Sequence, residues 1–332
     1  MLETLLELGR PLLADGATGT NLFEMGLSSG DSPELWNVTH PEQIQALHRS
    51  FVQAGADIVL TNSFGGNRRR LMLHQLEGRT HELNALAARI ARSATSGAGR
   101  PVVVAGSVGP TGDLLAPLGP ITEDEAFGIF VEQIEGLKEG GADVVWIETM
   151  SAPEEIRAAA RAASSLGMRY TVTASFDTAG KTMMGVAPAT LAALTADLDP
   201  KPLAFGANCG VGASDLVMSI LAMTQARPEA IVIAKANAGI PQWHGAHIHY
   251  SGTPELMAAY AGLAVDAGAR IVGGCCGSTA GHLAAMRRAI DGHAAAERPQ
   301  LADVVAALGP LVSPPSTAEG QTRARRRGSA AT

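Results

Sequence analysis

The sequence predicts an α/β protein whose fold is a single-domain (β/α)₈ TIM barrel. Three observations lead to this prediction: eight apolar segments end in Gly, Asn, Thr or Ser, helical segments lie between most of them, and the phrase AGAD, GGAD or AGAR precedes three of them. An open doubly wound sheet is the structural alternative. We place the barrel at residues 1–312. Residues 313–332 are rich in Pro, Ser, Gly, Arg and Ala without apolar periodicity, so we expect a disordered tail there.

The apolar segments are mostly continuous rather than alternating, as expected of strands that are covered on both faces of a parallel sheet. The chain is 46% hydrophobic but only 4% aromatic, so the core must be built mainly from Ala, Val, Leu and Ile. The strands are expected at residues 10–17, 56–64, 101–109, 142–150, 170–177, 202–210, 230–239 and 269–277.

Three of the intervening segments carry clear start and stop signals of helices. Residues 41–55 begin with a Pro, end with a Gly and place apolar side chains on one face. Residues 151–167 begin at Ser151, the predicted N-cap, which is followed by a Pro and two Glu residues near the positive end of the helix dipole. Residues 253–268 repeat this scheme. Helices that alternate with strands in this way are expected to surround a barrel.

Composition and charge exclude several classes of function. The formal net charge is −7, which does not suit non-specific binding to nucleic acid. No apolar run reaches the roughly 18 residues of a membrane helix, and the N-terminus MLETLLELGR lacks the basic region of a signal peptide. Three cysteines do not make a disulfide framework. We therefore expect a cytoplasmic protein without nucleic-acid or membrane partners; whether it is a monomer or a homo-oligomer stays open.

All three cysteines fall at the carboxyl ends of predicted strands, where the chemistry of a barrel is found. Cys209 ends the sixth strand, and Cys275 and Cys276 follow the eighth strand in the sequence VGGCCGS. Adjacent residues of a regular strand face opposite ways, so the backbone must bend to bring both sulfurs to one point, and the flanking glycines permit this. Small buried hydrophobes and a strained vicinal disulfide are the alternatives.

Three converging thiolates would form a zinc site with one open tetrahedral position, which is typical of catalytic zinc. Such a metal would bind a substrate thiol as an electron-rich thiolate, so the predicted chemistry is alkylation of a thiol. Asp15 and Glu148 end the first and fourth strands and could neutralise an ammonium group, although pairing with an Arg or capping a helix is the alternative. Asn237 could lend its oxygen to zinc or form a turn. The histidines of WHGAHIHY are either metal ligands or part of a surface loop.

Seven segments in order resemble the homocysteine S-methyltransferase family, over residues 10–290. They are DGATGTNL, HRSFVQAGADIVLTNSFGGNRRRL, GSVGPTGDLLAPLG, ADVVWIETM, GANCGVG, KANAGIP and GGCCG. The resemblance implies a zinc-bearing barrel that methylates homocysteine to methionine. The residues that it implies are the zinc ligands Cys209, Cys275 and Cys276, the amino-group ligands Asp15 and Glu148, and the backbone from Gly16 to Thr18 beside the homocysteine carboxylate.

The methyl donor is expected to be glycine betaine, because the whole chain is most similar to bacterial single-domain betaine–homocysteine methyltransferases. TNSFGG and GPTGDL also resemble the homocysteine module of cobalamin-dependent methionine synthase, so S-methylmethionine or a methylcorrinoid or methylfolate partner protein is the alternative. One departure is Gly65, where the animal betaine enzymes carry a Tyr that serves both the metal and the donor site. A non-catalytic zinc or thiol-binding subunit and a zinc hydrolase are rival classes.

An aromatic cage is the usual way to hold a quaternary ammonium group such as that of betaine. Trp36 is our first candidate for such a cage, with a role in the core or in an interface as the alternative. The other aromatic candidates are Phe23, Phe64, Trp243 and Tyr250.

Overall fold

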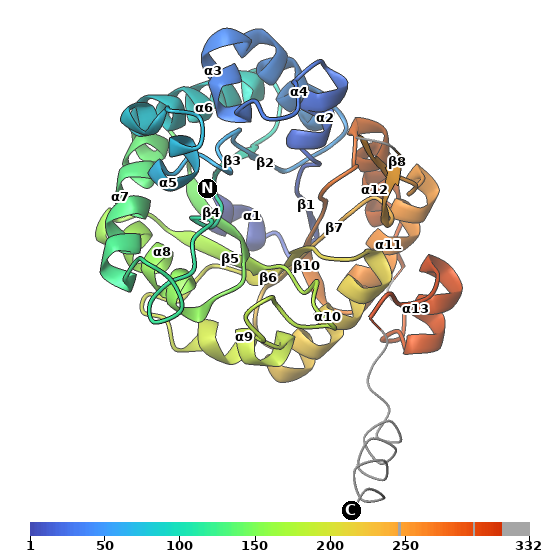
Figure 1. Cartoon of the computed structure of the whole chain (residues 1–332). Helices are drawn as coiled ribbons and strands as arrows, with labels where there is room; N and C mark the ends of the chain where they lie inside the picture. The colour runs from blue at the N-terminus through green and yellow to red at the C-terminus, as the bar shows by residue number, and fades with distance from the viewer. Residues whose placement is uncertain (245–246, 295, 314–332) are drawn as a thin grey trace, which may run out of the picture.

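The main sheet consists of eight parallel strands in the order β1-β10-β7-β6-β5-β4-β3-β2. A parallel bridge between Ala14 and Ile58 joins the first strand to the second, so the sheet closes into a barrel (Figure 1). This computed structural model describes residues 1–244, 247–294 and 296–313; the predicted tail beyond residue 313 lies outside the described residues. The predicted single-domain (β/α)₈ barrel is confirmed, and the open doubly wound sheet is excluded by the closure.

Every strand of the barrel lies within one of the eight predicted segments. The strands are β1 (Leu12–Leu13), β2 (Ile58–Leu60), β3 (Val103–Val108), β4 (Val144–Met150), β5 (Tyr170–Ala174), β6 (Phe205–Cys209), β7 (Val232–Ala236) and β10 (Ala269–Gly274). Their residues are buried almost without exception, because one face packs against helices and the other fills the barrel. This two-sided burial explains why the strands read as continuous apolar runs.

Eight helices surround the strands (Figure 1). They are α4 (Pro41–Gln53), α6 (Thr80–Thr95), α7 (Glu123–Glu139), α8 (Pro153–Ser165), α9 (Pro188–Ala196), α10 (Ala213–Ala226), α11 (Pro254–Asp266) and α12 (Ala280–Asp291). The remaining short elements are α1 (Leu2–Leu6), α2 (Gly19–Glu24), α3 (Trp36–Thr39), α5 (Arg68–Met72), α13 (Leu301–Leu308) and the 3-10 turns Pro33–Leu35 and Glu77–Arg79. Among the described residues, no helix combines the length and the apolar character needed to cross a membrane.

The three helices predicted from start and stop signals are confirmed as α4, α8 and α11. The cap of α11 is made by the Thr253 side chain, which accepts a hydrogen bond from the backbone N–H of Leu256. The prediction of Ser151 as the N-cap of α8 was wrong. The residue before that helix is Ala152, and the backbone carbonyl of Ser151 instead accepts a hydrogen bond of 2.8 Å from the Thr182 hydroxyl.

Helix α1 closes the amino-terminal end of the barrel, an arrangement that the sequence did not predict. Leu2 and Leu5 are buried in the same apolar cluster as Trp146, whose side chain lies inside the barrel. The carbonyl of Leu6 accepts a hydrogen bond from Arg270, at the start of β10, which fixes the helix beneath the strands. Figure 1 shows α1 through the centre of the ring.

The segment after β7 forms an antiparallel hairpin of β8 (Pro241–His244) and β9 (His247–Tyr250). The sequence predicts either a surface loop or a metal site here. The paired strands make the backbone more regular than the predicted loop. Residues 245–246 lie outside the described part. The side chains of residues 241–249, including the three histidines and Trp243, also lie outside the described residues, so a metal role for these histidines stays a prediction.

The aspartates of AGAD and GGAD have the same structural role at two places in the barrel. Asp57 precedes β2, and its Oδ2 accepts a hydrogen bond of 2.9 Å from the N–H of Leu13 in β1. Asp143 precedes β4, and its Oδ2 accepts a hydrogen bond of 2.8 Å from the N–H of Val104 in β3. Each carboxylate thus ties the start of one strand to its neighbour, which explains why the phrase recurs.

Asp57 makes further contacts besides the one to Leu13. It binds Arg10 at 2.8 and 3.0 Å and Arg287 at 3.2 Å, and it is only 3% exposed. We expect Asp57→Ala to lower the free energy of unfolding by about 3 kcal/mol, since the largely buried Arg287 and the buried N–H of Leu13 lose their partner. Urea denaturation followed by circular dichroism measures this. Glu132→Ala, which removes the exposed pair with Arg68, is the control and should cost less than about 1 kcal/mol. Equal losses in the two variants would contradict the assignment.

Candidate active site

The three cysteines predicted as a cluster lie together at the carboxyl ends of the strands. The Sγ atom of Cys209 lies 3.0 Å from that of Cys275 and 3.6 Å from that of Cys276. All three sulfurs fall within 4.8 Å of one another, and all three thiols are free. β7 pairs with both β6 and β10, so the two cysteine-bearing strands are separated by one strand only. The vicinal disulfide considered from the sequence is absent.

The backbone bends at both cysteine segments, as the surrounding glycines predicted. Cys209 itself has a φ of 59°, a conformation that only a few per cent of residues other than glycine adopt. After Cys275 the chain turns, and the N–H of Ser278 donates to the carbonyl of Cys275 at 3.1 Å. Gly274 permits this turn, because a Cβ atom there would lie 2.2 Å from the Ser278 hydroxyl oxygen. The turn brings two sulfurs from adjacent residues to the same side.

The three thiols affect one another's ionisation strongly. A hydrogen bond to the Cys275 sulfur raises the pKa of Cys209 well above its usual value. Hydrogen bonds from Cys209 and Cys275 lower the pKa of Cys276 to about 3. One thiolate is therefore stabilised by two neighbouring thiols, and ionisation of the other two requires a cation at the same point.

The donor set fits a metal ion. Zinc prefers sulfur and nitrogen or oxygen ligands in tetrahedral geometry, and three cysteines supply three of the four positions. Asn237, at the end of β7, donates from Nδ2 to the Gly210 carbonyl at 2.9 Å, while its buried Oδ1 has no hydrogen-bond partner within the described residues. Buried acceptors are rarely left without a partner, and this one belongs to the residue that follows β7, the strand between the two cysteine-bearing strands.

Asn208 positions Cys275, although the sequence analysis gave it no role. Its Oδ1 accepts from the Thr149 N–H at 2.9 Å and from the Thr173 hydroxyl at 2.7 Å. These contacts direct the amide nitrogen to Thr149 Oγ1 at 2.8 Å and to the Cys275 sulfur at 3.8 Å. Such outer contacts orient metal ligands and reduce the charge on a ligand sulfur.

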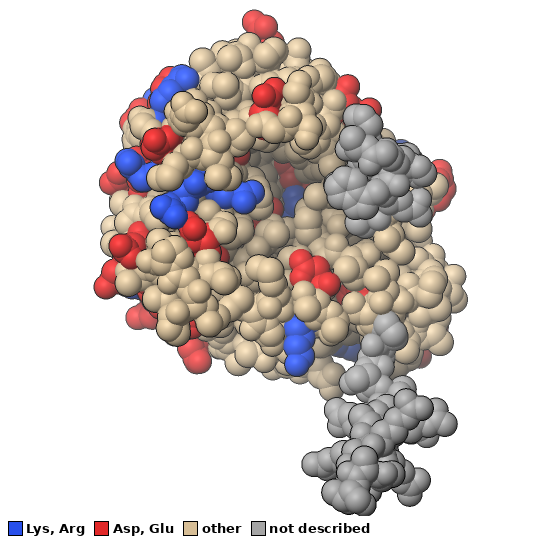
Figure 2. All heavy atoms as spheres, viewed as in Figure 1, with Lys and Arg blue, Asp and Glu red and all other residues tan. Residues whose placement is uncertain are grey.

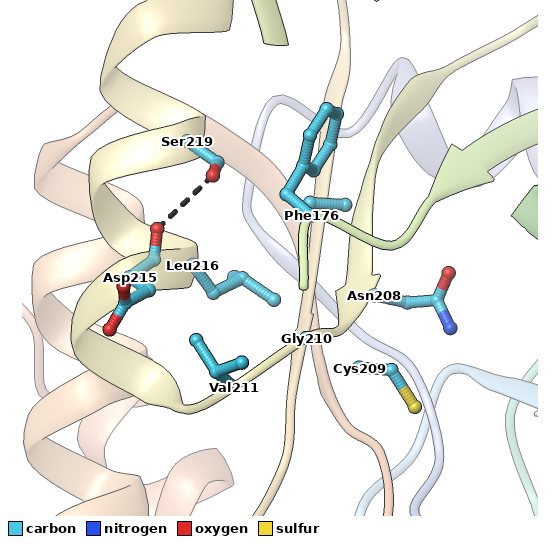
Figure 3. A pocket seen from close by; sticks show the side chains of 9 residues that line it. Phe176, Asn208, Cys209, Gly210, Val211, Asp215, Leu216 and Ser219 are labelled. Atoms are coloured by element: carbon cyan, nitrogen blue, oxygen red, sulfur yellow. Dashed lines mark hydrogen bonds between the residues drawn. The ribbon is translucent and has the colours of Figure 1, made fainter. Parts of the chain in front are cut away.

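The side of β6 that faces α10 does not belong to the sulfur cluster. A small pocket there is lined by Phe176, Val211 and Leu216 together with the backbone of the strand end. Figure 3 shows the side chains of Asn208 and Cys209 directed away from α10. The sulfur therefore points toward the barrel axis, where Figure 2 shows the molecule hollowed, with acidic and basic atoms visible inside the hollow.

The two predicted acids are both buried at the barrel end but differ in their surroundings. Glu148, on β4, accepts a hydrogen bond from the Ser107 hydroxyl, and burial raises its pKa to about 7. Asp15 is 0% exposed and accepts from Lys235 Nζ at 2.7 Å and from the Leu60 N–H at 2.7 Å. Burial raises the pKa of Asp15, an effect that the ammonium of Lys235 opposes.

Lys235 is a site residue that the sequence analysis missed. It lies on β7, is 2% exposed, and its Nζ lies 5.9 Å from the centre of the Trp146 ring inside the barrel. The signal was present: one Lys interrupts the apolar segment AIVIAKANAG, two residues before Asn237. A charged residue in a strand buried on both faces needs a partner, but the sequence alone does not identify that partner.

The backbone from Gly16 to Thr18 lies beside the cysteine turn, whereas its predicted place next to the homocysteine carboxylate stays a prediction. The N–H of Ala17 donates to the Ser278 carbonyl at 3.3 Å, two residues beyond Cys276. A Cβ atom at Gly16 would lie 3.0 Å from that same carbonyl oxygen, a tight contact, so glycine favours this close approach. Thr18 follows as the residue preceding α2.

Trp36 is placed in the core rather than at the cysteines. It is 7% exposed, belongs to the apolar cluster outside the barrel strands, and stacks on His40 with ring centres 4.4 Å apart. Little of the Trp36 surface remains for a ligand. This favours a role in the core over a role in an aromatic cage. Among the other candidates whose side chains the structure describes, the exposed rings are Phe23 and Phe64, at 52% and 37%.

Comparison with known proteins agrees with this geometry. The family model described as homocysteine S-methyltransferase matches residues 12–290. Methionine synthase of Mycobacterium tuberculosis is 31% identical over 300 residues, and that of Mycobacterium leprae is 30% identical over 314 residues. These matches cover 85% and 88% of this chain but 25% of each relative, so the chain spans about a quarter of their length.

A solved structure gives the same result. The crystal structure of the homocysteine methyltransferase MmuM from Escherichia coli, in its metallated form, is similar with a TM-score of 0.73 and 25% identity. The match covers 86% of this chain and 99% of that one. Since the family model extends over most of the barrel, including all three cysteines and both acids, the chain belongs to the homocysteine S-methyltransferase family.

Proposed function

We propose that the chain is a zinc-dependent homocysteine S-methyltransferase that forms methionine, with glycine betaine as the methyl donor and dimethylglycine as the product. The observation that carries this proposal is the convergence of three cysteine sulfurs at the barrel mouth, together with a buried acid on a neighbouring part of the rim. Membership of the family supports homocysteine as the thiol.

The residues of the site have separate tasks in this reaction. Cys209, Cys275 and Cys276 would hold zinc, which supplies a Lewis acid that keeps a thiol deprotonated near neutral pH. Asn237 would give up its position to the incoming sulfur. Asp15 and Glu148 offer carboxylates to the ammonium group of homocysteine, and the backbone beside Gly16 offers donors to its carboxylate.

Methyl transfer then needs orientation and exclusion of water more than proton transfer. The thiolate sulfur attacks the donor methyl carbon in line, the C–S bond forms, and the C–N bond breaks with its electron pair left on the nitrogen of dimethylglycine. Opposite charges are neutralised in this transition state, so a site that removes water from both reactants accelerates the step. The buried position of the sulfurs supports this.

The relatives favour a second class of donor. Both mycobacterial proteins are methionine synthases about four times as long as the matched segment. A barrel of this kind could therefore receive its methyl group from a methylcorrinoid or methylfolate partner protein. Gly65 stays a departure from the animal betaine enzymes: its N–H donates to Glu34 at 2.7 Å, and glycine has no side chain that could serve the metal or the donor.

Zinc binding is the first test. We expect protein purified without chelators to contain one zinc per chain by elemental analysis. Cys209→Ala, Cys275→Ala and Cys276→Ala should each weaken zinc binding by more than the roughly 10- to 100-fold that loss of an outer contact costs. Glu155→Gln removes a buried carboxylate that binds Thr111 outside the cluster, and it should keep its zinc. Absence of stoichiometric zinc from the unsubstituted chain would contradict the proposal.

The identity of the methyl donor is tested by assaying several donors with a single zinc-loaded preparation. With homocysteine as the acceptor, glycine betaine should give methionine and dimethylglycine in equal amounts, measured by mass spectrometry. S-methylmethionine, methylcobalamin and methyltetrahydrofolate are the comparison donors. Turnover with one of these and none with betaine would replace the donor assignment and leave homocysteine as the acceptor.

A further inference from the structure

Helix α5 places three consecutive arginines at the rim of the barrel, between β2 and β3. Two of them are neutralised by ion pairs. Arg68 binds Glu132 through two contacts of 2.8 Å, and Arg69 binds Asp113 at 2.6 and 3.1 Å. The third, Arg70, donates from its backbone N–H, whereas its guanidinium makes no hydrogen bond or ion pair with any described residue. Its charge is therefore available to a ligand.

The side chain of Arg70 rests on the loop that follows β3, residues 109–122. A Cβ atom at Gly112 would lie 3.1 Å from Arg70 Cδ and 3.2 Å from its Nη1. Gly112 has a φ of 87°, a conformation that favours glycine. The guanidinium is thus supported by backbone, and a side chain that is already ordered loses less entropy when it binds a ligand.

The helix and this loop are joined by buried contacts. Asn67 is 0% exposed, accepts from the Arg70 N–H at 3.0 Å and donates to the Pro110 carbonyl at 3.2 Å. The loop is held from its other side by Glu155, which accepts from the Thr111 N–H at 2.8 Å. The position of Arg70 is therefore set by the fold.

The loop that supports Arg70 begins at the wall of the candidate site. Ser107, in β3, donates from its hydroxyl to Glu148. Figure 2 shows basic atoms that lie over α5 and reach the edge of the hollow. Arg70 is half-buried, whereas Asp15 and Glu148 are buried. A free cation thus lies at the entrance, and the acids lie deeper.

This order of charges suits a donor with a positive and a negative end. Glycine betaine carries its methyl groups on a cationic nitrogen and has a carboxylate at the other end. The sulfurs and acids attract the cationic end and repel the carboxylate. A guanidinium at the entrance would bind the carboxylate through two parallel hydrogen bonds and stabilise the orientation in which a methyl group faces the sulfur.

We propose that Arg70 binds the carboxylate of the methyl donor and thereby selects donors that carry a carboxylate beside the methylated cation. The inference rests on the proposed function and deepens it, because it assigns a donor contact to a residue that the sequence analysis gave no role. It also explains why Arg70 lacks a partner while both neighbouring arginines are paired.

The test compares two ligands by calorimetric titration of the zinc-loaded chain saturated with homocysteine. Dimethylglycine and 2-(dimethylamino)ethanol share the dimethylamino group, cannot complete the methyl transfer, and differ in the carboxylate. Arg70→Gln should weaken dimethylglycine binding by about 10- to 100-fold, the effect of losing a charge-assisted contact, and leave 2-(dimethylamino)ethanol binding nearly unchanged. Arg70→Lys keeps the charge without the planar fork and should recover part of the loss.

Two variants control for general effects of charge. Arg68→Gln changes the same residue type in the same helix, and Lys181→Gln removes an exposed cation from the loop between β5 and α9. Both should keep the ratio of the two affinities. Arg70→Gln should also keep the thermal unfolding midpoint and the affinity for homocysteine, because its guanidinium has no partner within the described chain.

An unchanged ratio in Arg70→Gln would overturn the inference and leave the proposed function intact. Weaker binding of homocysteine, with dimethylglycine binding unchanged, would also overturn it and would assign Arg70 to the carboxylate of the thiol substrate. Failure of the unsubstituted chain to bind dimethylglycine and to use glycine betaine is a separate result, which would remove the donor proposal and this inference with it.

Discussion

Mutual repulsion among buried sulfurs and carboxylates is the constraint on which this site depends. Three sulfurs within 4.8 Å cannot all ionise unless a cation lies among them. The fold meets this condition with a donor set that suits zinc and with the ammonium of Lys235 held on the strand between the two cysteine strands. The same repulsion explains why Asp15 is paired with the ammonium of Lys235, at 2.7 Å.

Closure of the barrel makes these contacts possible. The bridge from Ala14 to Ile58 joins β1 to β2, the two edges of the sheet, into one ring, so residues from β1, β4, β6, β7 and β10 face one axis. Helix α1 and the Asp57 cluster secure the opposite end. The contacts that stabilise the barrel therefore lie at one end and the candidate site at the other, which is the usual arrangement of this fold.

The relatives show in what lengths of chain a similar barrel occurs. Methionine synthases contain a segment like this one within a chain about four times as long, and the E. coli homocysteine methyltransferase matches along nearly its whole length. The barrel is the part that this chain shares with these proteins.

The sequence by itself determined the eight strand segments and the convergence of Cys209, Cys275 and Cys276. Burial on both faces leaves a continuous apolar pattern, and strand ends in a barrel meet at one edge whatever their separation in the chain. Only the tertiary structure decided which side chains touch. The Lys235–Asp15 pair joins residues 220 positions apart, and the burial of Trp36 depends on packing against His40 and the helices around it. Such contacts are made by side-chain reach and the closure of the ring, neither of which leaves a periodic signal in the sequence.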